Sequence, residues 1–86
     1  MQKQMIKGIS LIKSSEYRFK ILKSIGNNIK TPSEISKEIK IRLNHISSFL
    51  KELKENNLVE CLNEDTKKGR LYRLTKLGKN VIAKFN

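Results

Sequence analysis

The chain repeats apolar residues every three or four positions in three consecutive stretches, which is the spacing of one face of an α-helix. The first stretch, 15–25, is followed by Gly26, a residue that tolerates the left-handed cap at a helix end. The second, 32–40, and the third, 43–56, are separated by two residues, which predicts an αα corner. The apolar positions expected to face the core are Tyr17, Ile21, Leu22, Ile25, Ile35, Ile39, Leu43, Ile46, Phe49, Leu50 and Leu53.

A helix-start signal precedes the second stretch. Thr31 offers a capping hydroxyl, Pro32 suits the first helical position, and Glu34 lies three residues after the cap. The second helix is therefore expected to begin at Pro32. After the third stretch stands Asn57, and Asn tolerates a positive φ better than most residues.

Two short runs with strand composition follow, at 58–62 and 71–74, and the connection between them is polar and includes a glycine. They predict a β-hairpin. Thr75 can then cap a last helix in which Leu77, Val81 and Phe85 share one face. A glycine at position 78 would cost that helix about 1 kcal/mol relative to Ala, which suggests that another backbone passes close to it.

The first thirteen residues leave two structures open. Met5, Ile9 and Ile12 have helical spacing, whereas the β-branched residues and the glycine among them would permit an extended form. No internal repeat and no linker divides the rest of the chain. We therefore predict one domain over 14–86, preceded by an N-terminal extension, 1–13, that is a candidate for dimerisation.

The net charge of the chain indicates what kind of partner it binds. The chain has 19 Lys and Arg against 8 Asp and Glu, a formal net charge of +11, and a polyanion such as nucleic acid would relieve the resulting self-repulsion. A lysine-rich composition can also reflect the amino-acid usage of a genome. Residues 1–30 carry seven cations and one anion (+6), 31–57 five and four (+1), and 58–86 seven and three (+4). We expect affinity to come from the helix at 15–25 and from the hairpin, and discrimination from the nearly neutral middle segment.

The order helix, helix, helix, hairpin, helix over 14–85 resembles the winged helix family, and it is similar to small winged-helix regulators common in archaea. Two positions depart from the pattern of many relatives, because Arg42 replaces a Ser or Thr cap and Asn57 replaces Gly. The motifs that carry the resemblance are TPSEIS at 31–36, LNHIS at 43–47, LKEL at 50–53, LVE at 58–60 and KGRLYRLT at 68–75.

The resemblance implies a mainly α fold with a small β-hairpin wing (α+β), built from a three-helix core and a C-terminal helix. It also implies a recognition helix at about 43–56 and a wing at about 63–70. The implied function is sequence-specific binding of double-stranded DNA as a transcription regulator, with the recognition helix in the major groove and the wing on the backbone or in the minor groove.

Polar side chains at the start of the recognition helix and basic ones in the wing are the candidate site. Asn can pair bidentately with adenine, Ser can bond to several bases, and wing cations can lie along phosphates. The alternative interpretation is a solvated helix face and an ordinary charged turn. The residues expected to contact DNA are Arg42, Asn44, His45, Ser47, Ser48, Lys51, Lys67, Lys68 and Arg70.

The sequence offers no set of residues that would predict a disulfide, a metal site or a catalytic site. Cys61 is the only cysteine and His45 the only histidine, so we predict no disulfide within the chain, no metal site and no cofactor. We find no nucleophile with a base and no phosphate-binding glycine loop, and expect neither an enzyme nor a small-molecule ligand. No apolar run approaches the ~20 residues that span a bilayer, so we expect a cytoplasmic protein without a membrane partner.

We expect a homodimer, because one helix reads only a few base pairs and operators usually repeat with the symmetry of the protein. We expect the dimer contact to use the apolar stripe of 1–13, that of the last helix, or both, since so short a chain has little core to cover both. Two other functions stay open: a winged-helix protein-protein adaptor in a transcription or RNA-processing complex, and a binder of structured RNA. An adaptor should expose a contiguous apolar patch.

Overall fold

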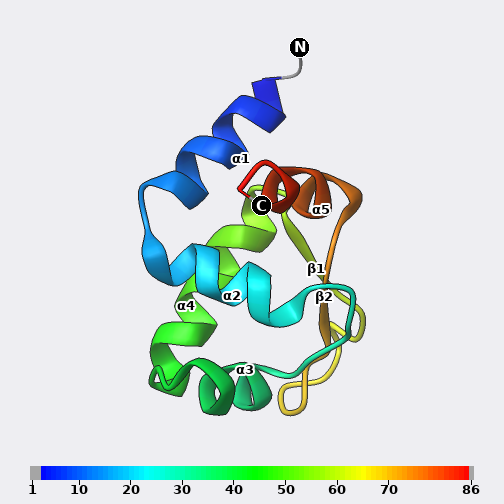
Figure 1. The fold of residues 1–86 in the computed structure, drawn as a ribbon. Helices are drawn as coiled ribbons and strands as arrows, with labels where there is room; N and C mark the ends of the chain where they lie inside the picture. Colours follow the sequence, from blue (N-terminus) through cyan, green and yellow to red (C-terminus); the bar gives the residue numbers. More distant parts are fainter. Residues whose placement is uncertain (1–2, 86) are drawn as a thin grey trace.

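Helices and a hairpin follow one another in the computed structural model, which describes residues 3–85, in the order that the sequence predicts (Figure 1). The mainly α fold with a small β-hairpin is confirmed, and the N-terminal segment, whose structure the sequence left open, is a helix. The elements are α1 (Lys3–Lys13), α2 (Glu16–Ile25), α3 (Pro32–Ile39), α4 (Leu43–Glu55), β1 (Val59–Cys61), β2 (Tyr72–Leu74) and α5 (Lys76–Ala83).

The core lies around α2, which crosses the middle of the molecule between α1 and α3 (Figure 1). Ile21 and Ile25 of α2 are fully buried, as are Ile46, Leu50 and Leu53 of α4. Together with α3 they form the three-helix core that the resemblance to winged helix proteins implies. The short corner between α3 and α4 contains Lys40, whose φ of 59° makes the sharp reversal.

Two residues that we expected in the core are exposed. Tyr17 and Leu43 each keep 47% of their surface accessible. On a helical wheel the apolar arc of α4 is about 120° wide, and Leu43 and Phe49 form its two edges. Phe49 is half-buried and meets the ring of Tyr17 edge-on at a centroid distance of 5.9 Å. The wheel gives the direction of a side chain but not how far the neighbouring helices extend. No neighbour fully covers Leu43, although Ile46 in the same turn is buried.

α1 packs along α5 and against α2 at the end of the molecule away from the hairpin loop (Figure 1). Met5 and Ile12 of α1 and Val81 of α5 are buried within the chain. The small size of Gly8 permits this approach, because a Cβ there would lie 2.9 Å from Val81 Cγ2. The expectation that one chain cannot cover both apolar stripes is therefore wrong: the two stripes cover each other.

The hairpin is antiparallel and pairs Val59 with Leu74 and Cys61 with Tyr72. Asn57, just before it, has a φ of 63°, as predicted. The close approach expected at position 78 is also confirmed. A Cβ on Gly78 would lie 2.1 Å from the carbonyl oxygen of Leu58, so α5 can cross the start of the hairpin only with glycine there.

Candidate nucleic-acid interface

A groove of about 820 Å³ opens between the start of α3, one face of α4 and the loop 63–70 that joins β1 to β2, which we call the wing. Five of the side chains that line the groove are basic and none is acidic. The five are Lys51, Lys54, Lys67, Lys68 and Arg70.

Backbone hydrogen bonds tie the wall formed by α3 to the wall formed by the hairpin. The amide of Lys30 donates to the carbonyl of Tyr72 at 2.9 Å, and the amide of Tyr72 donates to the carbonyl of Lys30 at 2.8 Å. The next residue, Thr31, is the N-cap of α3, and its hydroxyl accepts from the Glu34 amide while the Glu34 carboxylate accepts from the Thr31 amide. The predicted capping box is thus present, and it fixes where α3 begins beside the groove.

The base of the wing is closed by one asparagine. The side-chain oxygen of Asn63 accepts from the amide of Leu71 at 2.7 Å, and its side-chain nitrogen donates to the carbonyl of Gly69 at 3.2 Å. Gly69 has a φ of 67°, which supplies the turn. These bonds replace strand pairing beyond Leu62 and keep the two arms of the wing together.

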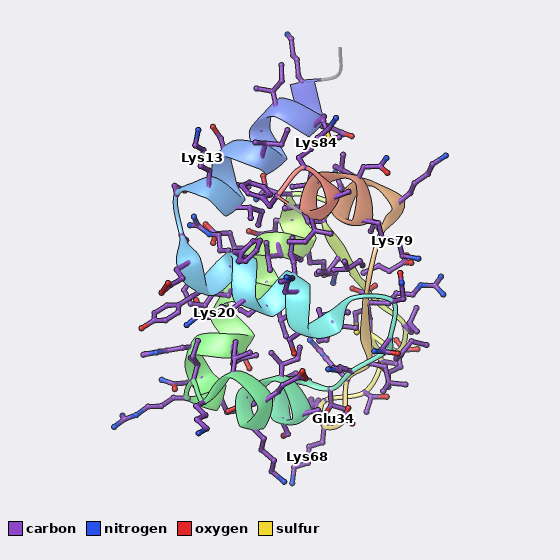
Figure 2. The ribbon with its side chains drawn as sticks, in the orientation of Figure 1. Lys13, Lys20, Glu34, Lys68, Lys79 and Lys84 are labelled. Carbon is purple, nitrogen blue, oxygen red and sulfur yellow. The ribbon has the colours of Figure 1, made fainter. Side chains whose placement is uncertain are left out.

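The cations of the wing have different surroundings. Arg70 donates to the carbonyl of Thr66 at 2.6 Å and to that of Glu64 at 3.4 Å, so its guanidinium holds the wing in shape. Lys67 and Lys68 are exposed, and no salt bridge within residues 3–85 involves either of them. Lys68 projects from the lower end of the molecule in Figure 2. These two lysines are the wing charges that are free to meet an anion.

On α4 the groove is lined by one stripe of the helix. Leu43, Ser47, Lys51 and Lys54 fall within about 80° on the helical wheel and all face the groove. Lys54 also forms an ion pair with Glu64, which connects the last turn of α4 to the wing.

The groove brings together five of the nine residues expected to contact DNA: Ser47, Lys51, Lys67, Lys68 and Arg70. The other four, which are Arg42, Asn44, His45 and Ser48, are exposed at the start of α4 but do not line the groove. Asn44 and Ser48 lie beside the groove-lining stripe on the helical wheel, whereas His45 points farther round. Arg42 is the N-cap of α4 and makes no capping hydrogen bond through its side chain.

Sequence reasoning missed several residues of the groove. Lys54 shares the stripe of Ser47 and Lys51, so the helical wheel could have found it. Leu43 was assigned to the core because it stands at the edge of the apolar arc. Gly69 lies within the predicted wing, between the expected contacts Lys68 and Arg70. For the others no local signal exists, because only tertiary packing brings them to α4; they are Thr31, Pro32, Ser33 and Tyr72.

The cations of α2, from which we expected part of the DNA affinity, do not line the groove. Arg18 binds Glu52 of α4 with two hydrogen bonds of 2.8 and 3.0 Å. Lys20 lies 3.8 Å from Glu16 in an ion pair along the helix, and Lys23 lies over the ring of Phe19. Of these three cations only Arg18 joins α2 to another helix, whereas Lys20 and Lys23 interact within α2.

Glu38 connects α3 to α2 and to the strand-like segment before α3. It accepts a hydrogen bond from the hydroxyl of Ser24 at 2.9 Å and pairs with the ammonium of Lys30. The hydrogen bond from Lys30, and next that from Ser24, hold the pKa of the Glu38 carboxyl below its ordinary value. Since Lys30 is also the residue that bridges to Tyr72, this polar cluster helps to place the α3 wall of the groove.

The lowered pKa of Glu38 makes part of the stability depend on pH. A carboxyl with a depressed pKa stabilises the folded state above the unfolded value of about 4.5, and this contribution is lost as pH falls through the folded value. We expect Glu38→Gln to melt at a lower temperature than the parent at pH 7, with the difference closing below about pH 4.5. Melting curves of both proteins between pH 3 and 7 test this, and a difference that does not change with pH would contradict it.

A helical corner whose second helix faces a groove, with a β-hairpin loop as the opposite wall, defines the class of winged helix domains. The sequence model of the winged helix-turn-helix family matches residues 13–86, and the chain belongs to this family. No curated protein matches the chain. Within the described residues, no helix is long and apolar enough to cross a membrane.

Solved structures show the same fold. TubR bound to 24 bp of tubC from Bacillus thuringiensis serovar israelensis pBtoxis has a TM-score of 0.82 at 10% identity, over 99% of this chain and 95% of TubR. Apo MarR from E. coli has a TM-score of 0.74 at 27% identity, over 95% of this chain and 62% of MarR. A mutant MarR in complex with operator DNA has a TM-score of 0.72 at 27% identity, over 95% of this chain and 60% of that one. These sources are bacterial, so the resemblance to archaeal regulators stays a prediction.

Proposed function

We propose that this chain is a transcription regulator that binds double-stranded DNA with α4 and the wing. The observation that carries the proposal is the groove between α3, α4 and the wing, whose lining includes five basic side chains and no acidic one. The similar fold of TubR bound to tubC DNA and of a mutant MarR bound to operator DNA supports it. In this proposal the protein works in the cytoplasm, where it meets DNA.

The two parts of the interface have different roles. The exposed face of α4 enters the major groove, where Ser47, Asn44 and Ser48 reach base edges. Lys67 and Lys68 lie on phosphates of the backbone or beside the minor groove, which fixes position without reading sequence. Arg70 supports the wing from within, a different role from the DNA contact expected from the sequence.

The exposed face of α4 also favours DNA over a protein partner. Apart from Leu43 its exposed residues are polar, whereas an adaptor should present a contiguous apolar patch. We therefore prefer the DNA-binding function to the adaptor.

Binding to a labelled duplex as a function of salt tests the proposal. If ~5–8 phosphates are neutralised, log affinity should fall against log salt with a slope of about −4 to −7. An affinity that is unchanged between 50 and 200 mM salt (about a fourfold range) would refute duplex binding by charge. An RNA duplex of the same sequence, tested in parallel, would replace DNA in the proposal if it bound more tightly. Selection from a random DNA library then identifies the operator.

We propose that Leu43 reads the methyl group of a thymine. It is exposed, lies at the first position of α4 and lines the groove, which suits apolar contact with a base in the major groove. Replacing the contacted thymine of the selected site by uracil should weaken binding about fourfold, since burial of one methyl-sized group is worth about 0.8 kcal/mol. In Leu43→Ser the same replacement should have no effect. If uracil at every thymine of the site weakens both proteins equally, Leu43 does not read a methyl group.

We further propose that two copies bind an inverted repeat as a homodimer, with recognition helices about 34 Å apart, one turn of the duplex. Because the apolar stripes of α1 and α5 cover each other, they leave little apolar surface for a stable contact between free chains. We expect a monomer at tens of micromolar without DNA and two copies on a palindromic site. Sedimentation equilibrium with and without that site measures both, and a single copy on the palindrome would reject the dimer.

A further inference from the structure

A second concentration of positive charge lies at the end of the molecule opposite the wing, where α1 and α5 pack side by side. Neither 3–15 nor 75–85 contains an Asp or Glu. All six lysines of these segments are exposed. We call this surface the six-lysine end; its members are Lys3, Lys7, Lys13, Lys76, Lys79 and Lys84.

No partner within the described chain compensates these charges. The ion pairs of residues 3–85 involve Arg18, Lys20, Lys30, Lys54 and Arg73, and none involves a lysine of the six-lysine end. Six of the eleven net positive charges of the protein are therefore concentrated on two adjacent helices. Like charges so close together oppose the compact state, and a bound polyanion would remove that cost.

The six-lysine end and the groove face away from each other. Lys13 and Lys84 lie near the upper end of Figure 2 and Lys79 lies lower, below α5, whereas Lys68 of the wing lies at the lower end. The molecule measures 37 × 26 × 20 Å along its principal axes, and α1 and the wing lie at the two ends of its longer dimension in Figure 1. A duplex held in the groove would leave the six-lysine end uncovered.

We propose that the six-lysine end binds the phosphates of a second DNA duplex, so that one chain bridges two duplex segments. This inference rests on the proposed function, because the first segment occupies the groove. Lysine is a compact point charge that suits phosphates without demanding a fixed geometry, so contact here is independent of sequence. A duplex fits better than an acidic protein, because residues 3–13 and 76–84 contain no Arg, Tyr or Trp, the usual anchors of protein interfaces.

A second copy of the chain and a lipid surface fit this end less well. Two copies meeting here would bring six lysines from each into one contact. A lipid surface would need an apolar face beside the charges, but Met5 and Ile12 are buried and the exposed large apolar residue of α1 is Ile6 alone. The six-lysine end therefore has the charge for a polyanion and little apolar area for a membrane.

A bridging experiment with the full chain tests the proposal. The selected duplex is attached to beads, the protein is added, and a fluorescent duplex of unrelated sequence follows at 50 mM salt. The comparison variant replaces the six lysines by Gln, which keeps helix propensity similar while removing charge. We expect the parent to retain the fluorescent duplex about tenfold better than the variant, while the amount of each protein on the beads differs by less than about threefold. We also expect bridging by the parent to disappear by about 300 mM salt.

The outcomes separate the possible failures. If the protein does not stay on the beads at all, the proposed function fails and not only this inference. If the variant bridges as well as the parent, two grooves of a dimer hold the two duplexes and the inference is wrong. Loss of bridging together with a change of oligomeric state in sedimentation, without DNA, would also overturn it. So would binding of anionic vesicles, but not of the second duplex, by the bead-bound parent.

Discussion

Replacing Lys51, Lys67 and Lys68 by Gln is expected to weaken binding of one duplex about 100- to 500-fold at 0.1 M salt. Each phosphate contact adds about 0.9 to the slope of log affinity against log salt, so three contacts contribute up to about 2.7 log units at 0.1 M. These three lysines line the groove, and no ion pair within residues 3–85 engages them. Lys54 and Arg70 stay unchanged, because their contacts with the wing would confuse charge with folding.

The matched control removes the same charge from the other end, as Lys3→Gln, Lys7→Gln and Lys76→Gln. With duplex in trace amounts, this control should lose less than about threefold in affinity, because none of its three lysines lines the groove. The groove variant should also show a slope smaller by about 2.7, for every duplex sequence tested. Equal losses in the two variants would mean that net charge alone governs binding and that the groove is not the site. Anisotropy titrations at four or more salt concentrations measure both quantities.

Gly78→Ala is expected to destabilise the protein by about 3 kcal/mol or more. The added Cβ would lie 2.1 Å from the carbonyl oxygen of Leu58. That oxygen belongs to the backbone, so no change of side-chain rotamer can relieve the clash, and α5 or the start of the hairpin would have to move. A domain of this length has a free energy of unfolding of about 4–13 kcal/mol, so this loss is a large share of it. Thermal unfolding should fall by about 12–24 °C.

Gly8→Ala is the matched control, since both glycines lie in helices and both changes raise helix propensity by about 1 kcal/mol. At Gly8 the nearest atoms are the side-chain carbons of Val81 and Leu58, at 2.9 and 3.2 Å, and a small shift of α1 would relieve the contact. We expect its melting temperature to change by less than half as much. If Gly78→Ala melted at or above the temperature of the parent, α5 would not lie against Leu58 as the structure has it.

The structural features that could be predicted most directly from the sequence are those that depend on residues a few positions apart. Thr31 and Glu34 satisfy each other's amides three residues apart, so the start of α3 could be predicted from local chemistry. The positive φ of Asn57 and the close contact at Gly78 were also predictable, because each residue type has a conformational or steric property that few others share. The helical order and the hairpin follow from the spacing of apolar residues.

Distances between segments far apart in the chain were decided only by tertiary packing. From the sequence, the segment that forms α1 could equally have been extended or have served as a dimer contact. In the structure it is a helix that packs on Val81, and the small size of Gly8 makes this approach possible. The backbone bridge between Lys30 and Tyr72 joins two walls of the groove. No local sequence pattern predicts this bridge, because the two residues are remote in sequence. For the same reason the groove residues Thr31, Pro32, Ser33 and Tyr72 were missed.

By itself the sequence determined the elements from α2 onward, their order, the net charge of +11 and the helix most suited to meet DNA. Tertiary structure decided which charges are free. Arg18 is bound to Glu52 and Arg70 to carbonyls of the wing, whereas Lys67, Lys68 and the six-lysine end face solvent. It also turned Leu43 from a core residue into a groove residue. The physical reason is that periodicity fixes the direction in which a side chain points, while its burial and its partners depend on where the other elements end.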